Sequence, residues 1–200
     1  MPARSSYDWG MGTALILLLL GFTCDSASAF TAAFSRRWGA RRGQWVTFVL
    51  RNVLGIPLWV IGLGLAVRAP SPSLFESSPL LEVLGWALLA AGCGVQLLAL
   101  VSLRGRAAKP SMADALVEHG VYRHIRHPIY AGLLLEFAAL ILVKPHRTVA
   151  LACLLGVLWA YLQARLEEVD LLQRMPAYRD YLARVPRFIP RLRPRRRSGA

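Results

Sequence analysis

Two groups of charged residues have the types and spacing to form one binding site. Arg126 and His127 precede Pro128, and Glu167 and Glu168 follow the next long apolar stretch. Proline favours the first turn of a helix, because its missing N–H would be unpaired there in any case. The helix N-terminus would add free N–H groups and partial positive charge to the two basic side chains, which predicts an anion site. The glutamates supply the opposite sign, so the two groups together suit a zwitterionic ligand.

The composition is that of an integral membrane protein. The chain has 200 residues and is 56% hydrophobic, whereas soluble domains average about 45–50% apolar residues. The net charge is +13, and the basic residues lie in the connections between apolar blocks and in the tail. That distribution is typical of membrane topology and of attraction to anionic lipids, and no motif supports a nucleic-acid partner. We expect membrane lipids as partners, with anionic lipids at the basic tail 191–200.

The apolar blocks predict an all-α integral membrane protein with about five transmembrane helices. Three long blocks fall within the region 1–103, at 11–34, 46–67 and 80–103. The first block also resembles a signal peptide, with small residues at 26–29. The arginines that follow it (Arg36, Arg37, Arg41 and Arg42) resist export, so we favour a retained helix.

The fourth and fifth apolar blocks, 129–143 and 149–162, are short. Fifteen helical residues rise only about 22 Å, less than the ~30 Å hydrocarbon core. We predict a short hairpin, unless flanking residues complete the two spans. Segment 163–181 has roughly helical apolar spacing and 185–190 is typical of an interfacial anchor, which predicts a C-terminal interfacial helix. Segment 111–117 is expected to be a short helix or a turn.

The basic residues also predict the orientation in the membrane. Connections 35–45, 104–127 and 163–200 are strongly basic, whereas 68–79 contains a single arginine. The positive-inside rule therefore places the N-terminus outside and the C-terminus in the cytoplasm. Lys144 and Arg147 conflict with this arrangement, because their charges would face outward unless the hairpin is shallow.

Polar residues recur at one depth inside the predicted spans. Asp25, Arg51, Gln96 and Glu136 all fall about 10–14 Å from the cytoplasmic end. Ionisable residues in a membrane cost roughly 2.5–3.5 kcal/mol each on insertion scales, so they require a reason. One interpretation is an internal Asp25–Arg51 ion pair, with the other two bonded to backbone. The other is the polar floor of a ligand pocket, with Arg51 and Gln96 facing the substrate.

The remaining candidate ligands favour a structural role. Three cysteines (Cys24, Cys93 and Cys153) lie inside apolar blocks without metal spacing, which indicates buried small side chains. His119, His124 and His127 share a loop with arginines, which repel cations. We therefore predict no metal site.

Residues 116–132 follow the pattern L-V-x-x-G-x-Y-x-x-x-R-H-P-x-Y-x-G. This run, together with Glu167-Glu168 and the segment 178–190, resembles the isoprenylcysteine carboxyl methyltransferase and phospholipid methyltransferase superfamily. The similarity covers about 104–190, which we treat as a methyltransferase-like cofactor-binding region. It implies a membrane-embedded, S-adenosylmethionine-dependent methyltransferase acting on a lipophilic acceptor. The implied cofactor-binding residues are Tyr122, His127, Tyr130, Gly132, Glu167 and Glu168.

Two residues are our catalytic candidates. We expect Arg126 to hold an acceptor carboxylate. Glu136 shares a helical face with Gly132, near the start of the motif helix, and would reach the same pocket. The acceptor stays open: a carboxylate, a lipid amine, an isoprenoid or a thiol would each fit.

The chain departs from the family pattern at two places. Asp114 stands where the family usually has histidine, and 174–178 lacks the usual glycine. Two alternatives to the methyltransferase are an NADPH-dependent membrane reductase of the sterol-reductase type and a non-enzymatic membrane protein. The reductase family's Asn-Asp and Lys-Tyr-Gly runs are not found here, which disfavours that alternative.

Overall fold

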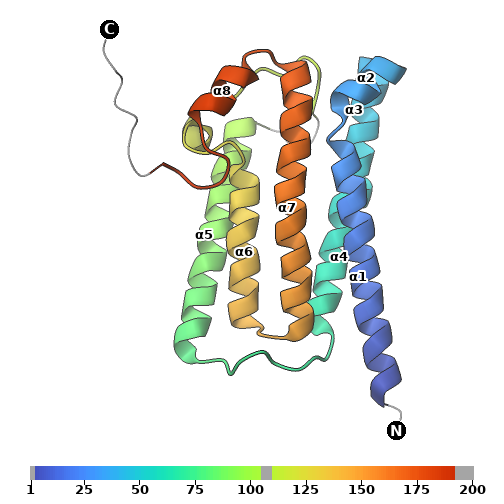
Figure 1. The fold of residues 1–200 in the computed structure, drawn as a ribbon, viewed down its shortest axis with the longest axis vertical. Coiled ribbons are helices and arrows are strands. Elements are labelled where there is room, and N and C mark those ends of the chain that lie inside the picture. Colours follow the sequence, from blue (N-terminus) through green and yellow to red (C-terminus); the bar gives the residue numbers. More distant parts are fainter. Residues whose placement is uncertain (1–2, 105–109, 192–200) are drawn as a thin grey trace.

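The protein is a bundle of long helices that run along one axis (Figure 1). The computed structural model describes residues 3–104 and 110–191, with side chains from Gly10 onward. Four described helices are long and apolar enough to cross a membrane, and a fifth is apolar but shorter. The all-α membrane fold expected from the sequence is therefore confirmed. The helices of the bundle are α1 (Ala3–Ser28), α3 (Ala40–Phe48) continuing into α4 (Ile56–Arg68), α5 (Pro79–Leu103), α6 (Pro128–Val143) and α7 (Arg147–Arg174).

The first and fifth membrane helices end at residues far from the ends of the predicted spans. The first predicted span continued to residue 34, but α1 ends at Ser28 and a separate short helix, α2 (Thr31–Trp38), follows. The fifth predicted span ended at 162, whereas α7 continues without a break through its polar half to Arg174. At ~1.5 Å per residue, α7 is long enough to cross the membrane and extend beyond it. The carboxylates of Glu167 and Glu168 therefore lie on the same rigid helix as the apolar span.

A π-helical segment interrupts the second membrane helix. Residues Val49–Gly55 join α3 to α4, and the N–H of Ile56 bonds the carbonyl of Arg51, five residues back. Pro57 explains the irregularity, because a proline inside an α-helix lacks an N–H and clashes with the carbonyl four residues earlier. The wider π-turn relieves both problems, and such turns are common at functional sites. It carries Arg51 toward the interior of the bundle.

Glycines bring the helices close together. A Cβ atom built on Gly92 of α5 would lie 2.7 Å from the carbonyl oxygen of Gly132 on α6. The α1–α4 contact uses Gly21, where a Cβ would lie 2.4 Å from the backbone nitrogen of Trp59. Small residues are the usual means of close packing between membrane helices, because lipid supplies no hydrophobic driving force there. Ala14, Leu18 and Phe22 of α1 belong to the main core cluster.

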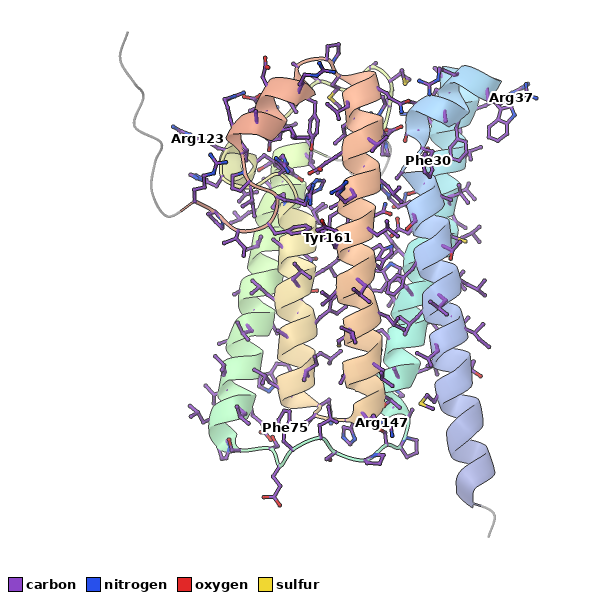
Figure 2. All side chains as sticks on the ribbon, viewed as in Figure 1. Phe30, Arg37, Phe75, Arg123, Arg147 and Tyr161 are labelled. Carbon is purple, nitrogen blue, oxygen red and sulfur yellow. The ribbon has the colours of Figure 1, made fainter. Side chains whose placement is uncertain are left out.

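The two ends of the bundle differ in charge. Arg37 and Arg123 lie at one end, with α2 and α8 (Tyr178–Arg184), whereas Arg147 and Phe75 lie at the other (Figures 1 and 2). The α6–α7 turn does not stop short. Its Pro145 carbonyl accepts a bond from the N–H of Leu74 at 2.7 Å, which joins it to the connection after α4. Lys144 and Arg147 thus lie at the end opposite to the other basic connections. The sequence had left open whether a shallow hairpin would avoid this placement.

The C-terminal part folds back over the bundle. After α8, the C-terminal segment (185–191) runs back to the start of α6 (Figure 1). Segment 111–117, expected to be a short helix or a turn, contains a turn in which the Asp114 N–H bonds the Ser111 carbonyl at 3.2 Å. Part of the predicted basic loop (105–109) and of the basic tail (192–200) lies outside the described residues.

Candidate functional site

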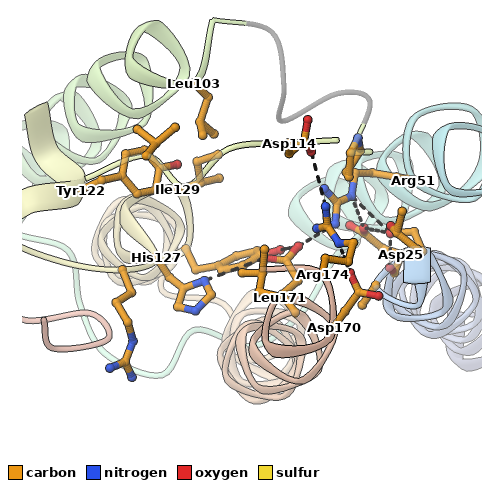
Figure 3. A pocket seen from close by; sticks show the side chains of 18 of the residues that line it. Asp25, Arg51, Leu103, Asp114, Tyr122, His127, Ile129, Asp170, Leu171 and Arg174 are labelled. Atoms are coloured by element: carbon orange, nitrogen blue, oxygen red, sulfur yellow. Dashed lines mark hydrogen bonds and ion pairs between the residues drawn. The ribbon is translucent and has the colours of Figure 1, made fainter. Parts of the chain in front are cut away.

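A cavity of about 490 Å³ lies at the end of the bundle that carries α2 and α8. Its described walls come from α1, the π-helical segment, α4, α5, α6, α7 and α8, and from the loop 110–122. Figure 3 shows Tyr122 and Ile129 on one side and Asp25, Arg51 and Arg174 on the other. Pockets of 300–1,000 Å³ are typical of small-molecule sites. Of the predicted site residues, the cavity is lined by Arg51, Gln96, Tyr122, Arg126, His127, Tyr130 and Glu167.

The N–H groups that precede α6 are not free. The N–H of Arg126 bonds the carbonyl of Pro186 at 2.9 Å, and that of His127 bonds the carbonyl of Arg187 at 3.0 Å. The C-terminal segment therefore pairs the two N–H groups just before the first turn of α6 and satisfies their hydrogen-bonding capacity. The anion site expected from the N–H groups of the first turn itself stays a prediction, since α6 begins at Pro128.

Glu168 gathers three basic side chains. Arg126 Nη2 lies 3.0 Å from Glu168 Oε1, and Arg187 Nη2 lies 2.6 Å from Oε2. His127 Nε2 lies 3.2 Å from Oε1. The bond to Glu168 raises the pKa of Arg187, which keeps that guanidinium charged. Glu168 is absent from the described cavity lining, so these contacts indicate that it anchors the C-terminal segment to α6 and α7.

Arg126 is held by more than Glu168. Its Nη1 donates to the carbonyl of Leu182 at 2.5 Å and to that of Val185 at 2.7 Å. These bonds to the end of α8 use most of its five donors. The side chain lines the cavity but is committed to holding α8, so the geometry gives no support to our expectation that it holds an acceptor carboxylate.

Glu167 points in a different direction and does line the cavity. Consecutive helical residues are rotated by about 100°, which separates it from Glu168. Arg51 Nη2 donates to Glu167 Oε1 at 2.5 Å, and the hydroxyl of Tyr130 donates to the same oxygen at 2.7 Å. His127 Nδ1 lies 3.8 Å from Oε2. The motif helix, the π-helical segment and α7 therefore meet at this carboxylate.

The predicted polar layer is present only in part. Arg51 Nε lies 3.5 Å from Asp25 Oδ1 and donates to Ser28 Oγ at 3.2 Å. Gln96 also lines the cavity. Glu136 is not part of the described lining; it lies between α5 and α6, where the thiol of Cys93 donates to it at 3.4 Å. The shared face with Gly132 was correctly deduced, but that face packs on α5.

Gly132 likewise serves helix packing in the structure. A Cβ at this position would lie 2.6 Å from Gln96 Cγ and 2.7 Å from the carbonyl oxygen of Gly92. Gly132 is absent from the described cavity lining. Because Gly132 has no side chain, Gln96 of α5 can lie against its backbone. Gln96 lines the cavity, so Gly132 affects the cavity's shape indirectly.

A second ionic group was missed from the sequence. Arg174 Nε lies 2.6 Å from Asp170 Oδ2, and its Nη1 lies 3.4 Å from Asp114 Oδ2. Nη1 also donates to the carbonyl of Ser111 at 2.6 Å. Arg174 thereby ties the turn 111–114 to α7, and Figure 3 shows the link between Asp114 and Arg174 in the cavity wall. The four-residue spacing of Asp170 and Arg174 was the available signal, and Asp114, noted as a departure from the family pattern, supplies the partner.

Aromatic rings line the inner part of the cavity. Trp159 stacks on Phe22 with centroids 4.6 Å apart, and it meets Tyr130 edge to face at 5.9 Å. Trp59 lies 5.8 Å from Trp159. Trp59, Tyr130 and Trp159 all line the cavity. The two tryptophans were missed because a tryptophan in an apolar span is ordinarily a packing residue.

Three tyrosines near α8 form the outer wall. The hydroxyl of Tyr181 donates to the carbonyl of Tyr122 at 2.6 Å, which links α8 to the loop before α6. Burial raises the pKa of Tyr122, Tyr178 and Tyr181, so all three phenols stay neutral at physiological pH. They act here as hydrogen-bonding and packing groups.

Residues 106–173 match the model of the Isoprenylcysteine carboxyl methyltransferase (ICMT) family. No match was found among curated proteins or among solved structures. The matched region contains the start of α6 and the Glu167–Glu168 pair, so it confirms the resemblance seen in the sequence. It leaves out Asp25, Arg51 and Trp59, which the structure brings to the same cavity. With the membrane-spanning helices, the match supports a membrane methyltransferase in general.

Proposed function

From this family match, we propose that the protein transfers a methyl group from S-adenosylmethionine to a lipophilic acceptor in the cavity beneath α8. One observation carries the proposal: the matched motif and Glu167, far apart in sequence, meet at one cavity. Tyr130 bonds Glu167 at 2.7 Å, and His127 lies 3.8 Å from it. A zwitterionic cofactor needs both signs of charge within a single small site.

The described lining suits such a cofactor. The hydroxyl of Tyr178, in a residue only 2% exposed, has no hydrogen-bond partner among the described groups, and neither does the indole N–H of Trp159. Buried polar atoms of native proteins are normally paired, so unpaired ones along a cavity point to a polar ligand. Glu167, Tyr130, His127 and Tyr122 would hold the cofactor. When bound, S-adenosylmethionine supplies a methyl group activated by a positively charged sulfur.

The protein's own contribution is orientation and exclusion of water. Arg51 and Tyr130 fix the Glu167 carboxylate in place, which positions a charged partner before reaction. The turn 111–114, held by Arg174, contributes Asp114 to the cavity wall. Displacement of water by bound ligands would strengthen the electrostatic contacts inside the cavity.

The acceptor would enter from the bilayer. Several aliphatic residues line the cavity, and five of them come from α4, α5 and α6 (Ile56, Leu100, Leu103, Ile129 and Leu133). Leu100 is also 48% exposed on the outer surface. Apolar walls that reach the lipid-facing surface favour an acceptor with a hydrocarbon chain. Our proposed orientation places this end in the cytoplasm, with anionic lipids at its basic residues.

A binding titration tests the proposal. Purified protein would be titrated with S-adenosylmethionine, S-adenosylhomocysteine and NADPH. We expect the two sulfur compounds to bind and NADPH not to bind. His127→Ala and Glu167→Gln should each weaken S-adenosylhomocysteine binding roughly tenfold, the loss expected for one charge-assisted bond. Binding of NADPH alone would select the reductase, and normal affinity in both variants would show that the cofactor lies elsewhere.

A further inference from the structure

The charges on one side of the cavity are unbalanced. Four carboxylates line it near α1 and α7 (Asp25, Asp114, Glu167 and Asp170), with two guanidinium groups between them (Arg51 and Arg174). Arg51 pairs with Asp25 and Glu167, and Arg174 pairs with Asp114 and Asp170. Each of these arginines therefore serves two carboxylates. Among the described residues, this side of the cavity carries an excess of two negative charges.

Aromatic rings border the same side. Trp59 and Trp159 line the cavity with centroids 5.8 Å apart, and Trp59 lies next to Asp25. Tyr130 stands edge to face against Trp159 and bonds Glu167. Carboxylates and aromatic rings on one side of a cavity form an environment that attracts cations, because the ring faces carry partial negative charge as well. An alkylammonium group is the ligand that combines such a charge with an apolar surface.

An anionic acceptor fits this subsite poorly. Arg126 and Arg187 are bound to Glu168, and Glu168 is not among the described lining residues. A carboxylate arriving beside Asp25 would have to displace Asp25 or Glu167 from Arg51. Displacement would leave a buried carboxylate without its partner, which is strongly unfavourable.

We propose that the methyl acceptor is an amine carried on a lipophilic chain, held by Asp25 and the rings of Trp59 and Trp159. This proposal rests on the proposed methyltransferase function and names its substrate class. The bound ammonium first gives a proton to the Asp25 carboxylate. The lone pair of the resulting neutral amine forms the new nitrogen–carbon bond as the methyl–sulfur bond breaks, with that electron pair remaining on sulfur, and the product leaves as the methylated ammonium cation. Two of its three named residues, Asp25 and Trp59, lie outside the segment that matches the family, whereas Trp159 of the subsite lies inside it.

The chemistry of the transferred methyl group tests this assignment. Purified protein would be incubated with a total membrane lipid extract and S-adenosylmethionine that carries a radiolabelled methyl group. Mild alkali releases the label of a methyl ester as volatile methanol, whereas an N-methyl group stays bound. We expect an alkali-stable label that mass spectrometry assigns to nitrogen. Volatile methanol, a label on sulfur, or no labelled lipid would overturn the amine assignment. If the unmodified protein did not bind S-adenosylhomocysteine in the titration described above, that result would instead overturn the proposed function.

A cofactor-free binding measurement tests the subsite. Tryptophan fluorescence in neutral maltoside detergent would follow titrations with decyltrimethylammonium and with decanoate. We expect the cation to bind at least tenfold more tightly than the anion, and Asp25→Asn to weaken it roughly tenfold. Glu76→Gln, which removes an exposed carboxylate from the connection after α4, is the matched control and should change nothing.

Three outcomes of this measurement would refute the subsite. These are tighter binding of decanoate, unchanged cation affinity in Asp25→Asn, or weaker S-adenosylhomocysteine binding in Asp25→Asn with cation binding intact. The last outcome would assign the carboxylate to the cofactor instead. The comparison of decyltrimethylammonium with decanoate uses the unmodified protein, so it decides the question even if Asp25→Asn does not fold.

Discussion

Arg51 is the residue whose replacement tests the site architecture most directly. Its side chain is 14% exposed, and those of its partners Asp25 and Glu167 are 6% and 20% exposed. Arg51→Met removes the cation and leaves two largely buried carboxylates without it. Removing one partner of a buried ion pair typically costs about 3–5 kcal/mol. At roughly 2–4 °C per kcal/mol for a protein of this size, thermal unfolding in detergent should shift down by roughly 6–20 °C.

The companion variants separate charge from packing. Adding Asp25→Asn to Arg51→Met should recover part of the lost stability, because one uncompensated charge is removed. Arg37→Met, at an exposed position on α2, should change stability by less than about 0.5 kcal/mol. S-adenosylhomocysteine affinity would be measured on each folded variant. An Arg51→Met protein that melts and binds like the wild type would show that the contacts between the N-terminal helices and α7 do not hold the site together.

Three further perturbations have defined outcomes. Arg187→Ala removes two bonds to Glu168 and should free the C-terminal segment. We expect faster proteolysis after residue 184 and a free energy of unfolding lower by about 1–3 kcal/mol. Unchanged proteolysis would contradict the anchoring role. Gly132→Val places atoms within 2.7 Å of α5. We expect the free energy of unfolding to fall by at least about 1–3 kcal/mol, measured by thermal unfolding. Full stability would mean that the α5–α6 contact is looser than described. The pKa of Tyr181 is raised above its usual 10, so the unfolded chain loses this proton at a lower pH than the folded protein does. The free energy of unfolding should therefore fall as the pH rises above about 10. Tyr181→Phe should reduce the slope of that fall.

The sequence predicted the meeting of the two charged groups, but not the way in which they meet. Arg126 and His127 were expected to surround a ligand together with both glutamates. Both line the cavity, but both also contact Glu168, which lies outside the described lining. A helix start that a distant segment covers has the same residue pattern in the sequence as a helix start that stays uncovered. Only the fold-back of 185–191, which depends on long-range packing, distinguishes the two.

Depth along a helix could be read from the sequence, but rotation about it could not. Asp25, Arg51 and Gln96 reach the cavity as expected, whereas Glu136 faces α5. The direction of a side chain depends on which neighbour its helix packs against, and the glycines that decide the α5–α6 contact are equally compatible with ligand approach. The partners of Arg174 were missed for a related reason, since Asp114 belongs to a loop without periodicity.

The π-helical segment makes the length of the second membrane helix as important as its composition. Val49 and Val53, exposed toward the surroundings of the bundle, can vary freely in size. Loss of a single residue between 49 and 55 would let the backbone return to regular α-helical winding, which removes the wide turn and shortens the helix by about 1.5 Å. Arg51, which lies inside this segment, would then lose the turn that carries it to Asp25 and Glu167. This stretch should therefore tolerate many exchanges of side chains and no change in the number of residues.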